Sequence, residues 1–396
     1  MPESEAADLR STLLHDWHVA HGGRMVGFAG YEMPVHYADG IIAEHAATRR
    51  GAGLFDINHM GRFIIEGADA GSFLAQVLTS DVAALQPMRA QYCFIADEHG
   101  AALDDAYLYH LDSHYMLVVN AANRDKDWRW LIQASAGHEV SLRDDTESLG
   151  MIALQGPESD ALLGTALGTT PGVDSRRNHL AWTRLAQSPL LMSRTGYTGE
   201  RCCYELFADN ATILELWQRL VGTGATPVGL GARDSLRTEA ALPLYGHELG
   251  ADPNGDPIPI FANPLARFGV RKDDQDFIGG PALAAQRACV AAYAADDFSD
   301  TTAVPHVVRA FEVVQSRRPV RPGFTIGCAS TSEQLGWISS GASVPVLDTS
   351  SGATQRPQTR SIGLAMLAPQ VAYGARQVDL VALDNRGKPL PIALRS

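Results

Sequence analysis

The sequence predicts an α+β fold in which strands and helices are mixed along most of the chain and the C-terminal part is rich in strands. Between residues 61 and 120, runs with apolar side chains at alternate positions are typical of half-buried strands. Helical patterns at 68–78 and 209–221 occur among the strands without the regular strand–helix–strand alternation of a parallel sheet. Beyond residue 306 the patterns are mainly of the strand type.

The N-terminal part is expected to begin with two helices. Residues 5–20 show apolar side chains on one helical face, formed by Leu9, Leu13, Trp17 and Ala20. Residues 41–50 form a second, short helix, which Gly51 and Gly53 should end. The strands predicted after these helices are residues 61–66, 91–96, 101–110 and 115–120.

Two further helices are predicted in the middle of the chain. Asn120 is expected to be the N-cap of a helix that runs through Trp128 and Leu131, because its amide side chain suits that position and Asp125 follows in the early turns. Residues 209–221 have apolar side chains at helical spacing, namely Ile213, Leu216, Trp217 and Leu220.

The length of 396 residues predicts two or three domains, since one ordinary hydrophobic core does not grow to this size. A Pro/Gly/Asp-rich loop is expected at 250–262 and a polar linker at 295–305. We therefore expect a region 1–295 made of two interleaved α+β domains, and a C-terminal β domain at 306–396 with a polar insertion at 348–358. Its predicted strands include residues 307–314, 336–340, 361–366 and 378–383.

Composition excludes several classes of function. A net charge of −13 argues against nucleic acid and anionic membranes as partners, since both attract positive proteins. The sequence contains no run of 18 apolar residues, so no membrane span is predicted. The acidic N-terminus does not resemble a signal peptide, and a cytoplasmic location is expected. Five cysteines without a repeated Cys-x-x-Cys pattern favour free thiols and no metal site. For the adjacent Cys202 and Cys203 a vicinal disulfide stays open, but two half-buried thiols are favoured.

The stretch from Arg194 to Glu248 holds the densest group of candidate binding residues. It combines polar and aromatic side chains with glycines that allow tight turns or a close approach to a ligand. Glu205 can accept parallel hydrogen bonds from an amidine-like heterocycle, and Arg233 can hold an anionic group. A folate carries both a guanidine-like edge and an anionic tail, so it is one possible ligand.

Asp104 and Asp105 form a pair of acids in a predicted strand. Because successive side chains of a strand point to opposite faces, one carboxylate is expected inside and the other in solvent. An inward carboxylate needs a hydrogen-bonding partner or a function in proton transfer. The spacing alone favours neither interpretation.

Several ordered motifs resemble one family closely. These motifs are residues 25–37, 40–45, 53–61, 103–105, 117–124 and 194–248. Together they resemble the aminomethyltransferase, or T protein, of the glycine cleavage system, whose wider family includes tetrahydrofolate-dependent demethylases. Residues 336–341 and 362–365 resemble the C-terminal β domain of that family, so the resemblance extends over nearly the whole chain.

The resemblance implies a fold, a cofactor and a set of site residues. The family fold is a three-domain cloverleaf around a central folate channel, with a C-terminal β-barrel-like domain, and the family transfers a one-carbon unit to N5 of tetrahydrofolate. Asp104 matches the acid beside the reactive folate nitrogens, and Glu205 and Arg233 match cofactor-binding positions. The remaining positions that the resemblance places at the cofactor are Met60, Tyr92, Asn120, Tyr197 and Tyr245.

The sequence departs from the family pattern in places that affect the substrate. The segment before Glu205 is one residue longer than in the family, through Cys202-Cys203. One extra residue in a strand turns the following side chains to the other face unless a β-bulge absorbs it. Glu200 is therefore the alternative carboxylate. A family glutamate is replaced by Phe261, and an apolar ring there suits a donor other than an aminomethylated lipoyl arm.

Three functions compete. The first is an aminomethyltransferase that uses tetrahydrofolate, with a lipoyl carrier (H) protein as donor, and the retained Asp104-Asp105 favours it. The second is a tetrahydrofolate-dependent demethylase of a small N-, O- or S-methyl compound, which Phe261 and Cys202 favour. The third is a folate-binding protein without catalysis, against which the joint presence of Asp104, Glu205 and Arg233 argues.

Overall fold

The chain forms two compact units, each assembled from separate sections of the sequence. The computed structural model describes residues 9–272, 276–314, 316–331, 333–347 and 358–395. The first unit comprises Met1–Ala70, Ala84–Gln91 and Tyr107–Leu236. The second comprises Gly71–Ala83, Tyr92–Ala106 and Arg237–Ser396. The domain boundaries expected at 1–295 and 306–396 stay a prediction.

The first unit contains a three-stranded sheet of order β1-β3-β2 and a six-stranded sheet of order β11-β12-β13-β10-β4-β14. A third sheet has the order β6-β7-β8-β5-β9, and its strands β6 and β7 continue into the second unit. The elements of this unit are β1 (Arg10–Ser11), α1 (His15–Ala20), β2 (Arg24–Phe28), β3 (Tyr31–His36), α2 (Gly40–Arg50), β4 (Gly53–Asp56), β5 (Gly61–Glu66), β8 (Tyr115–Val119), α4 (Arg124–Ala134), β9 (Ser141–Asp144), β10 (Leu149–Gln155), α5 (Ser159–Leu167), β11 (Leu180–Leu185), β12 (Ser188–Ser193), β13 (Cys203–Asp209), α6 (Asn210–Gly222) and β14 (Thr226–Val228).

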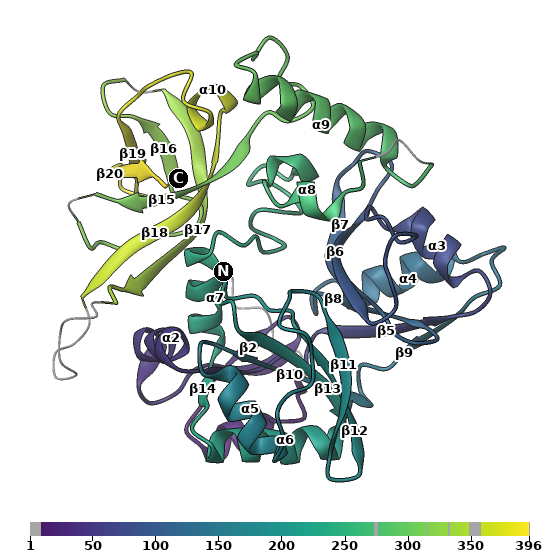
Figure 1. Ribbon diagram of the computed structural model, residues 1–396. Coiled ribbons are helices and arrows are strands. Elements are labelled where there is room, and N and C mark those ends of the chain that lie inside the picture. The colour runs from purple at the N-terminus through teal and green to yellow at the C-terminus, as the bar shows by residue number, and fades with distance from the viewer. Residues whose placement is uncertain (1–8, 273–275, 315, 332, 348–357, 396) are drawn as a thin grey trace. The chain divides into compact units, whose positions relative to one another are not determined.

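The six-stranded sheet is covered by α5 and α6, which lie beside each other in Figure 1. Helix α6 begins where the side chain of Asp209 accepts a hydrogen bond from the backbone N–H of Thr212, at 3.0 Å, and so caps the helix. Apolar side chains recur along its inner face and are fully buried against the sheet. They are Ile213, Leu216, Trp217 and Leu220, the residues that the sequence pattern predicted.

The other elements lie in the second unit or cross between the two. Strands β6 and β7 and helices α3 and α7 have residues in both units. These elements are α3 (Ala70–Val77), β6 (Arg89–Ala96), β7 (Ala102–His110), α7 (Leu230–Glu239), the 3-10 helix η1 (Ile260–Ala262), α8 (Ala266–Gly269), α9 (Gly280–Ala294), β15 (Val307–Val313), β16 (Thr325–Cys328), β17 (Gln334–Pro345), β18 (Thr359–Leu367), α10 (Pro369–Ala372), β19 (Leu380–Leu383) and β20 (Pro389–Leu394).

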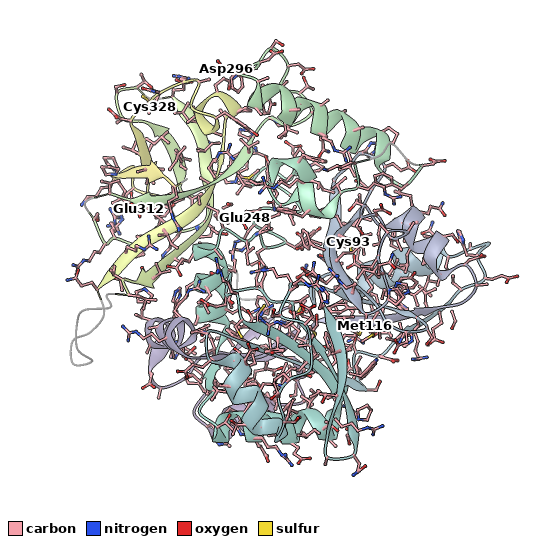
Figure 2. All side chains as sticks on the ribbon, viewed as in Figure 1. Cys93, Met116, Glu248, Asp296, Glu312 and Cys328 are labelled. Atoms are coloured by element: carbon pink, nitrogen blue, oxygen red, sulfur yellow. The ribbon has the colours of Figure 1, made fainter. Side chains whose placement is uncertain are left out.

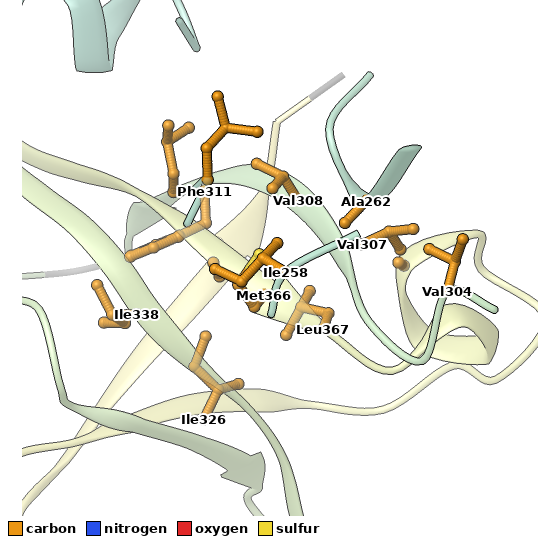
Figure 3. Close-up of a cluster of buried hydrophobic side chains, with 14 of the residues drawn as sticks. Ile258, Ala262, Val304, Val307, Val308, Phe311, Ile326, Ile338, Met366 and Leu367 are labelled. Atoms are coloured by element: carbon orange, nitrogen blue, oxygen red, sulfur yellow. The ribbon is translucent and has the colours of Figure 1, made fainter. Parts of the chain in front are cut away.

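The C-terminal strands close into a barrel of order β15-β18-β17-β16-β19-β20. Its interior is filled by side chains such as Phe311, Ile326 and Ile338, all completely buried, and Figure 3 shows Ile258 and Ala262 next to this core. The loop 250–262 is therefore attached to the barrel through apolar contacts. An α+β fold with a C-terminal β barrel, as the sequence predicted, is confirmed.

The predicted N-terminal helix is wrong over residues 10–14. Arg10 and Ser11 form a strand that pairs with β3, and the helix begins only at His15; residues 5–8 lie outside the described part. The hydroxyl of Thr12 donates a hydrogen bond of 2.7 Å to buried Asp56, which fixes this segment in an extended path. Such tertiary contacts outweigh local helix propensity.

Asn120 is not the N-cap of the next helix. Helix α4 begins at Arg124, and the residue at the N-cap position is Asn123. A turn closed by the bond from the Asn123 N–H to the Asn120 carbonyl, 3.0 Å long, precedes the helix.

The predicted insertion at 348–358 lies outside the described residues except for Gln358. Among the described helices, none has both the length and the apolar character needed to cross a lipid bilayer.

Candidate functional site

Glu205 lies in the middle of β13, opposite Ala153 of β10 and Ser193 of β12. The pairing of β13 with β10 runs without interruption from Cys203 to Asp209, so the strand contains no bulge. Cys202, in the segment that is longer than the family pattern, lies in the turn before β13. The regular alternation of the strand therefore determines to which face of the sheet the Glu205 side chain points.

Glu200, the alternative carboxylate, is already bound. Its Oε1 lies 2.5 Å from Nη1 of Arg49, and Arg49 also donates a hydrogen bond of 2.8 Å to the carbonyl of Thr198. This ion pair closes the turn between residues 198 and 200. The geometry therefore favours Glu205 as the ligand-binding carboxylate.

The Glu205 carboxylate is 8% exposed and receives two hydrogen bonds from side chains of the same unit. The hydroxyl of Tyr109 donates to Oε2 at 2.7 Å, and the hydroxyl of Thr195 donates to the same oxygen. These donors offset the cost of burying a carboxylate. Sequence reasoning missed Tyr109 and Thr195, although Thr195 lies inside the motif that drew attention to this stretch.

Arg233 extends from the first turn of α7, which begins at Leu230, within the Gly229-Leu230-Gly231 sequence. A Cβ atom on Gly229 would lie 2.5 Å from the carbonyl group of Val35, and one on Gly231 would lie 2.5 Å from Ile41 Cδ1. The two glycines therefore allow α7 to approach β3 and α2 closely. Glu44 completes the contact by accepting a hydrogen bond of 2.9 Å from the Gly229 N–H.

The guanidinium group of Arg233 lies beside three of the predicted cofactor residues. Its central carbon is 5.0 Å from the centroid of the Tyr197 ring, and its Nη2 is 4.0 Å from Sδ of Met60. Burial lowers the pKa of Arg233, while the nearby Tyr197 and Glu205 oppose this shift. Glu205, Arg233, Tyr197 and Met60 thus form one electrostatically connected group.

One donor of this group is unsatisfied. Nη1 of Arg233 is buried and has no hydrogen-bond partner among the described residues. A buried guanidinium N–H without an acceptor costs free energy, so such an atom is a sign of a ligand position. The chemistry fits a ligand that presents an acceptor to Arg233 and donors to Glu205.

The turn that carries Tyr197 is fixed by Gln155, another residue that sequence reasoning missed. Oε1 of Gln155 accepts hydrogen bonds from the Tyr197 N–H at 3.1 Å and from the Thr198 hydroxyl at 2.6 Å. A Cβ atom on Gly196 would lie 2.8 Å from the Gln155 amide, so glycine is needed there.

Asn120 belongs to the same unit and directly follows β8.

In the second unit the two acids of β7 differ in exposure. Asp104 is completely buried, whereas Asp105 is half-buried and accepts a hydrogen bond of 2.9 Å from the hydroxyl of Tyr92. Alternation places Asp104 on the strand face of Ala102 and Ala106, both buried. The structure therefore brings predicted Tyr92 to Asp105, the neighbour of the predicted acid.

Tyr245 lies in the loop that follows α7 in the second unit. Its ring packs on Gly250, where a Cβ atom would be 3.2 Å from ring carbon Cζ. The loop is held by Glu248, which is fully buried and accepts a hydrogen bond of 3.0 Å from the Leu244 N–H. Glu248 thus supports the loop from inside.

The two sequence departures occupy positions that do not offer a binding group. Phe261 is 8% exposed and belongs to the barrel-side core, with the Arg287 guanidinium 5.4 Å above its ring. Cys202 is half-buried beside Arg194, with Nη1 to Sγ at 3.9 Å. All five cysteines are free thiols, so Cys202 and Cys203 form no disulfide.

Comparisons with known proteins point to one family. Residues 14–258 match the GCVT N-terminal domain. The chain is 44% identical to the aminomethyltransferase of Herpetosiphon aurantiacus over 69% of this chain and 74% of that protein. It is 37% identical to the aminomethyltransferase of Rubrobacter xylanophilus over 94% of both chains. The solved glycine cleavage system aminomethyltransferase T from Bartonella henselae is similar with a TM-score of 0.81 and 27% identity, over 98% of this chain and 97% of that chain.

Proposed function

Since this chain belongs to the glycine cleavage T-protein family, we propose that it is an aminomethyltransferase that moves a one-carbon unit to N5 of tetrahydrofolate. The observation that carries the proposal is the group around Arg233. A buried Nη1 without an acceptor lies in the same connected group as the Glu205 carboxylate. A pterin offers the matching pair, a carbonyl acceptor next to guanidine-like N–H donors.

The residues of the first unit bind the pterin. Glu205 would accept hydrogen bonds from the pterin N–H groups, and Arg233 would donate to an acceptor on the same ring system. The Tyr197 ring lies against the guanidinium group, 5.0 Å from its central carbon. This arrangement differs from the one first considered, in which Glu205 and Arg233 hold opposite ends of a folate, because the two charges interact with each other.

For the acid of the reaction the family resemblance implies Asp104, and we propose its neighbour Asp105 as a second candidate. A group that contacts a reacting atom has to be reachable in the bound state, and of the two acids Asp104 is completely buried in this structure. Asp105 is half-buried, and the hydroxyl of Tyr92 orients its carboxylate. Asp105 stabilises the positive charge that develops while the carbon is transferred, and Tyr92 keeps the carboxylate in place.

Bound tetrahydrofolate supplies an amine nucleophile, so the protein contributes positioning and one charged group. Within the first unit, Glu205 and Arg233 would fix the ring system. That an acid of β7 acts at the reacting atoms is what the family resemblance implies. The donor is an aminomethyl group on a lipoyl carrier protein, as the family resemblance implies: the carbon would leave the lipoyl sulfur, which departs as a thiol, and the amino group would be released as ammonia. Phe261, one of the two departures that favour a small methyl compound, is buried in the barrel-side core, which supports the carrier protein as donor.

The test is an incubation of the protein with tetrahydrofolate and one of two donors. The first donor is an aminomethylated lipoyl carrier protein, and the second is a panel of small N-, O- and S-methyl compounds. Methylene-tetrahydrofolate formed only with the carrier protein supports the proposal. Methyl-tetrahydrofolate formed from the panel indicates a demethylase, and folate binding without either product indicates a non-catalytic binder.

A further inference from the structure

Among the described residues, the side chains that donate hydrogen bonds to the Glu205 carboxylate reach only one of its two oxygens. Both protein donors, the hydroxyls of Tyr109 and Thr195, bind Oε2. Oε1 receives no hydrogen bond from the described residues. A carboxylate has about four acceptor positions, so the capacity that remains lies mainly on Oε1.

Tyr109 is a permanent donor held in one orientation. Its side chain is completely buried, and its ring lies edge-on to Phe207 at 5.3 Å and 72°. Burial, followed by the charge of Glu205, raises the pKa of the Tyr109 phenol well above its ordinary value. The phenol therefore stays protonated throughout the neutral range and donates to Glu205 there.

Thr195 is the second donor and belongs to a short hydrogen-bonded chain. Its hydroxyl lies 2.8 Å from the hydroxyl of Ser193. Thr195 has a single hydroxyl hydrogen, which it donates to the carboxylate, so Ser193 is the donor in the other bond. Each bond in such a chain strengthens the next, and the negative charge of Glu205 fixes the direction of both.

We propose that Tyr109 and Thr195 are positioning residues that hold the Glu205 carboxylate by Oε2 and present Oε1 to the N–H groups of a bound pterin. This inference rests on the proposed function. A glutamate side chain has several rotatable bonds, and fixing one oxygen removes the rotational freedom that ligand binding would otherwise have to restrict. It also makes the position selective for a ligand that donates hydrogen bonds.

The experiment is a double-mutant cycle with tetrahydrofolate as the probe, measured by titration calorimetry. Tyr109→Phe removes only the hydroxyl and is expected to raise the Kd about five- to tenfold. In a Glu205→Gln background the same change is expected to alter the Kd less than about twofold, because its effect passes through the carboxylate. Thr195→Val should weaken binding and Thr195→Ser should retain it.

The matched control is Tyr204→Phe. Tyr204 is the neighbour of Glu205 in β13, is 2% exposed, and donates its hydroxyl to Asp160. It faces the other side of the strand, so its loss should leave the Kd unchanged even where it lowers the melting temperature. A second measurement compares the Kd of tetrahydrofolate with that of an analogue that lacks the 2-amino group. The ratio of the two Kd values should be smaller in Tyr109→Phe than in the wild type.

The outcomes separate this inference from the proposed function. If the wild type binds tetrahydrofolate and Glu205→Gln weakens binding, but Tyr109→Phe and Thr195→Val do not, only the positioning role is overturned. Equal effects of Tyr109→Phe in both backgrounds also overturn it, since they would show a general structural role. If the wild type does not bind tetrahydrofolate, the proposed function fails and this inference fails with it.

Discussion

Arg237 and Glu248 form a fully buried ion pair, with Nη1 and Oε2 2.9 Å apart and both side chains at most 1% exposed. Ser340 of the barrel strand β17 joins the pair: it accepts a hydrogen bond of 2.7 Å from Nη2 of Arg237 and donates one of 2.5 Å to Oε1 of Glu248. Glu248 is labelled in Figure 2. The motif around Glu248 drew attention as a candidate ligand site, but the carboxylate is used to hold the loop with Tyr245 on the barrel.

The first prediction concerns this pair. Glu248→Gln keeps the size of the side chain but leaves the charge of Arg237 buried without its counter-ion, so the free energy of unfolding should fall by about 3–5 kcal/mol. Urea denaturation measures the effect. The control is Glu312→Gln, also labelled in Figure 2, whose carboxylate is 45% exposed and 3.4 Å from Arg360; it should change stability by less than about 0.5 kcal/mol. An equally small effect at Glu248 would contradict the buried-pair interpretation.

The second prediction compares the two candidate carboxylates for the pterin. Glu205→Gln should raise the Kd for tetrahydrofolate about tenfold or more, because an uncharged amide accepts hydrogen bonds more weakly and presents its own donors. Glu200→Gln should leave the Kd nearly unchanged, since Glu200 is bound to Arg49. Calorimetry on both variants decides between them. Weaker binding for Glu200→Gln alone would reverse the assignment.

How far the sequence predicts this site depends on the kind of information each residue needs. Glu205 and Arg233 lie in motifs whose chemistry is visible in the chain itself. The choice of Asp104 came from the family resemblance and stays a prediction, because spacing cannot decide between Asp104 and Asp105: alternation separates the two faces without saying which is buried. Tyr109 was missed because its role depends on a contact with Glu205, 96 positions away in the sequence.

The fold shows the same division. Helix α6 was predicted nearly to its ends, because its apolar spacing is a local signal. The prediction of a helix over residues 10–14 was wrong, because the contacts that decide their path are long-range. These contacts are the pairing of β1 with β3 and the bond from Thr12 to Asp56. Local patterns cannot reveal such contacts, and they decide the path of short segments.

The third prediction tests the acid of β7. Asp105→Asn should lower turnover about a hundredfold or more while the Kd for tetrahydrofolate stays within about threefold, because the charge acts on the reacting atoms. Asp104→Asn should mainly lower stability, since its carboxylate is completely buried. Steady-state rates and melting temperatures for the pair give the answer. Full turnover in a folded Asp105→Asn protein, with loss in Asp104→Asn, would return the role to Asp104.

The fourth prediction is a pH dependence of stability that originates at His59. This imidazole is 4% exposed, and burial, together with the charges of Arg233 and Arg62, lowers its pKa to about 4 although Asp56 opposes the shift. The unfolded chain binds the proton near pH 6.5, so between pH 6.5 and about 4 the unfolded state holds more protons than the folded state. Stability must therefore fall as the pH drops through this window, by about 3 kcal/mol in total.

Asp56 acts in a separate pH window. Burial alone would raise the pKa of Asp56, but hydrogen bonds with His18, Asn58 and Thr12 lower it to about 2, so its contribution is lost only as the pH falls from about 3.8 towards 2. Urea denaturation of wild type and His59→Asn at pH 7, 5.5 and 4.5 isolates the histidine. The loss between pH 7 and 4.5 should shrink in His59→Asn and persist in the exposed control His99→Gln. An undiminished loss in His59→Asn would contradict the prediction, because it would show that other groups take up the protons.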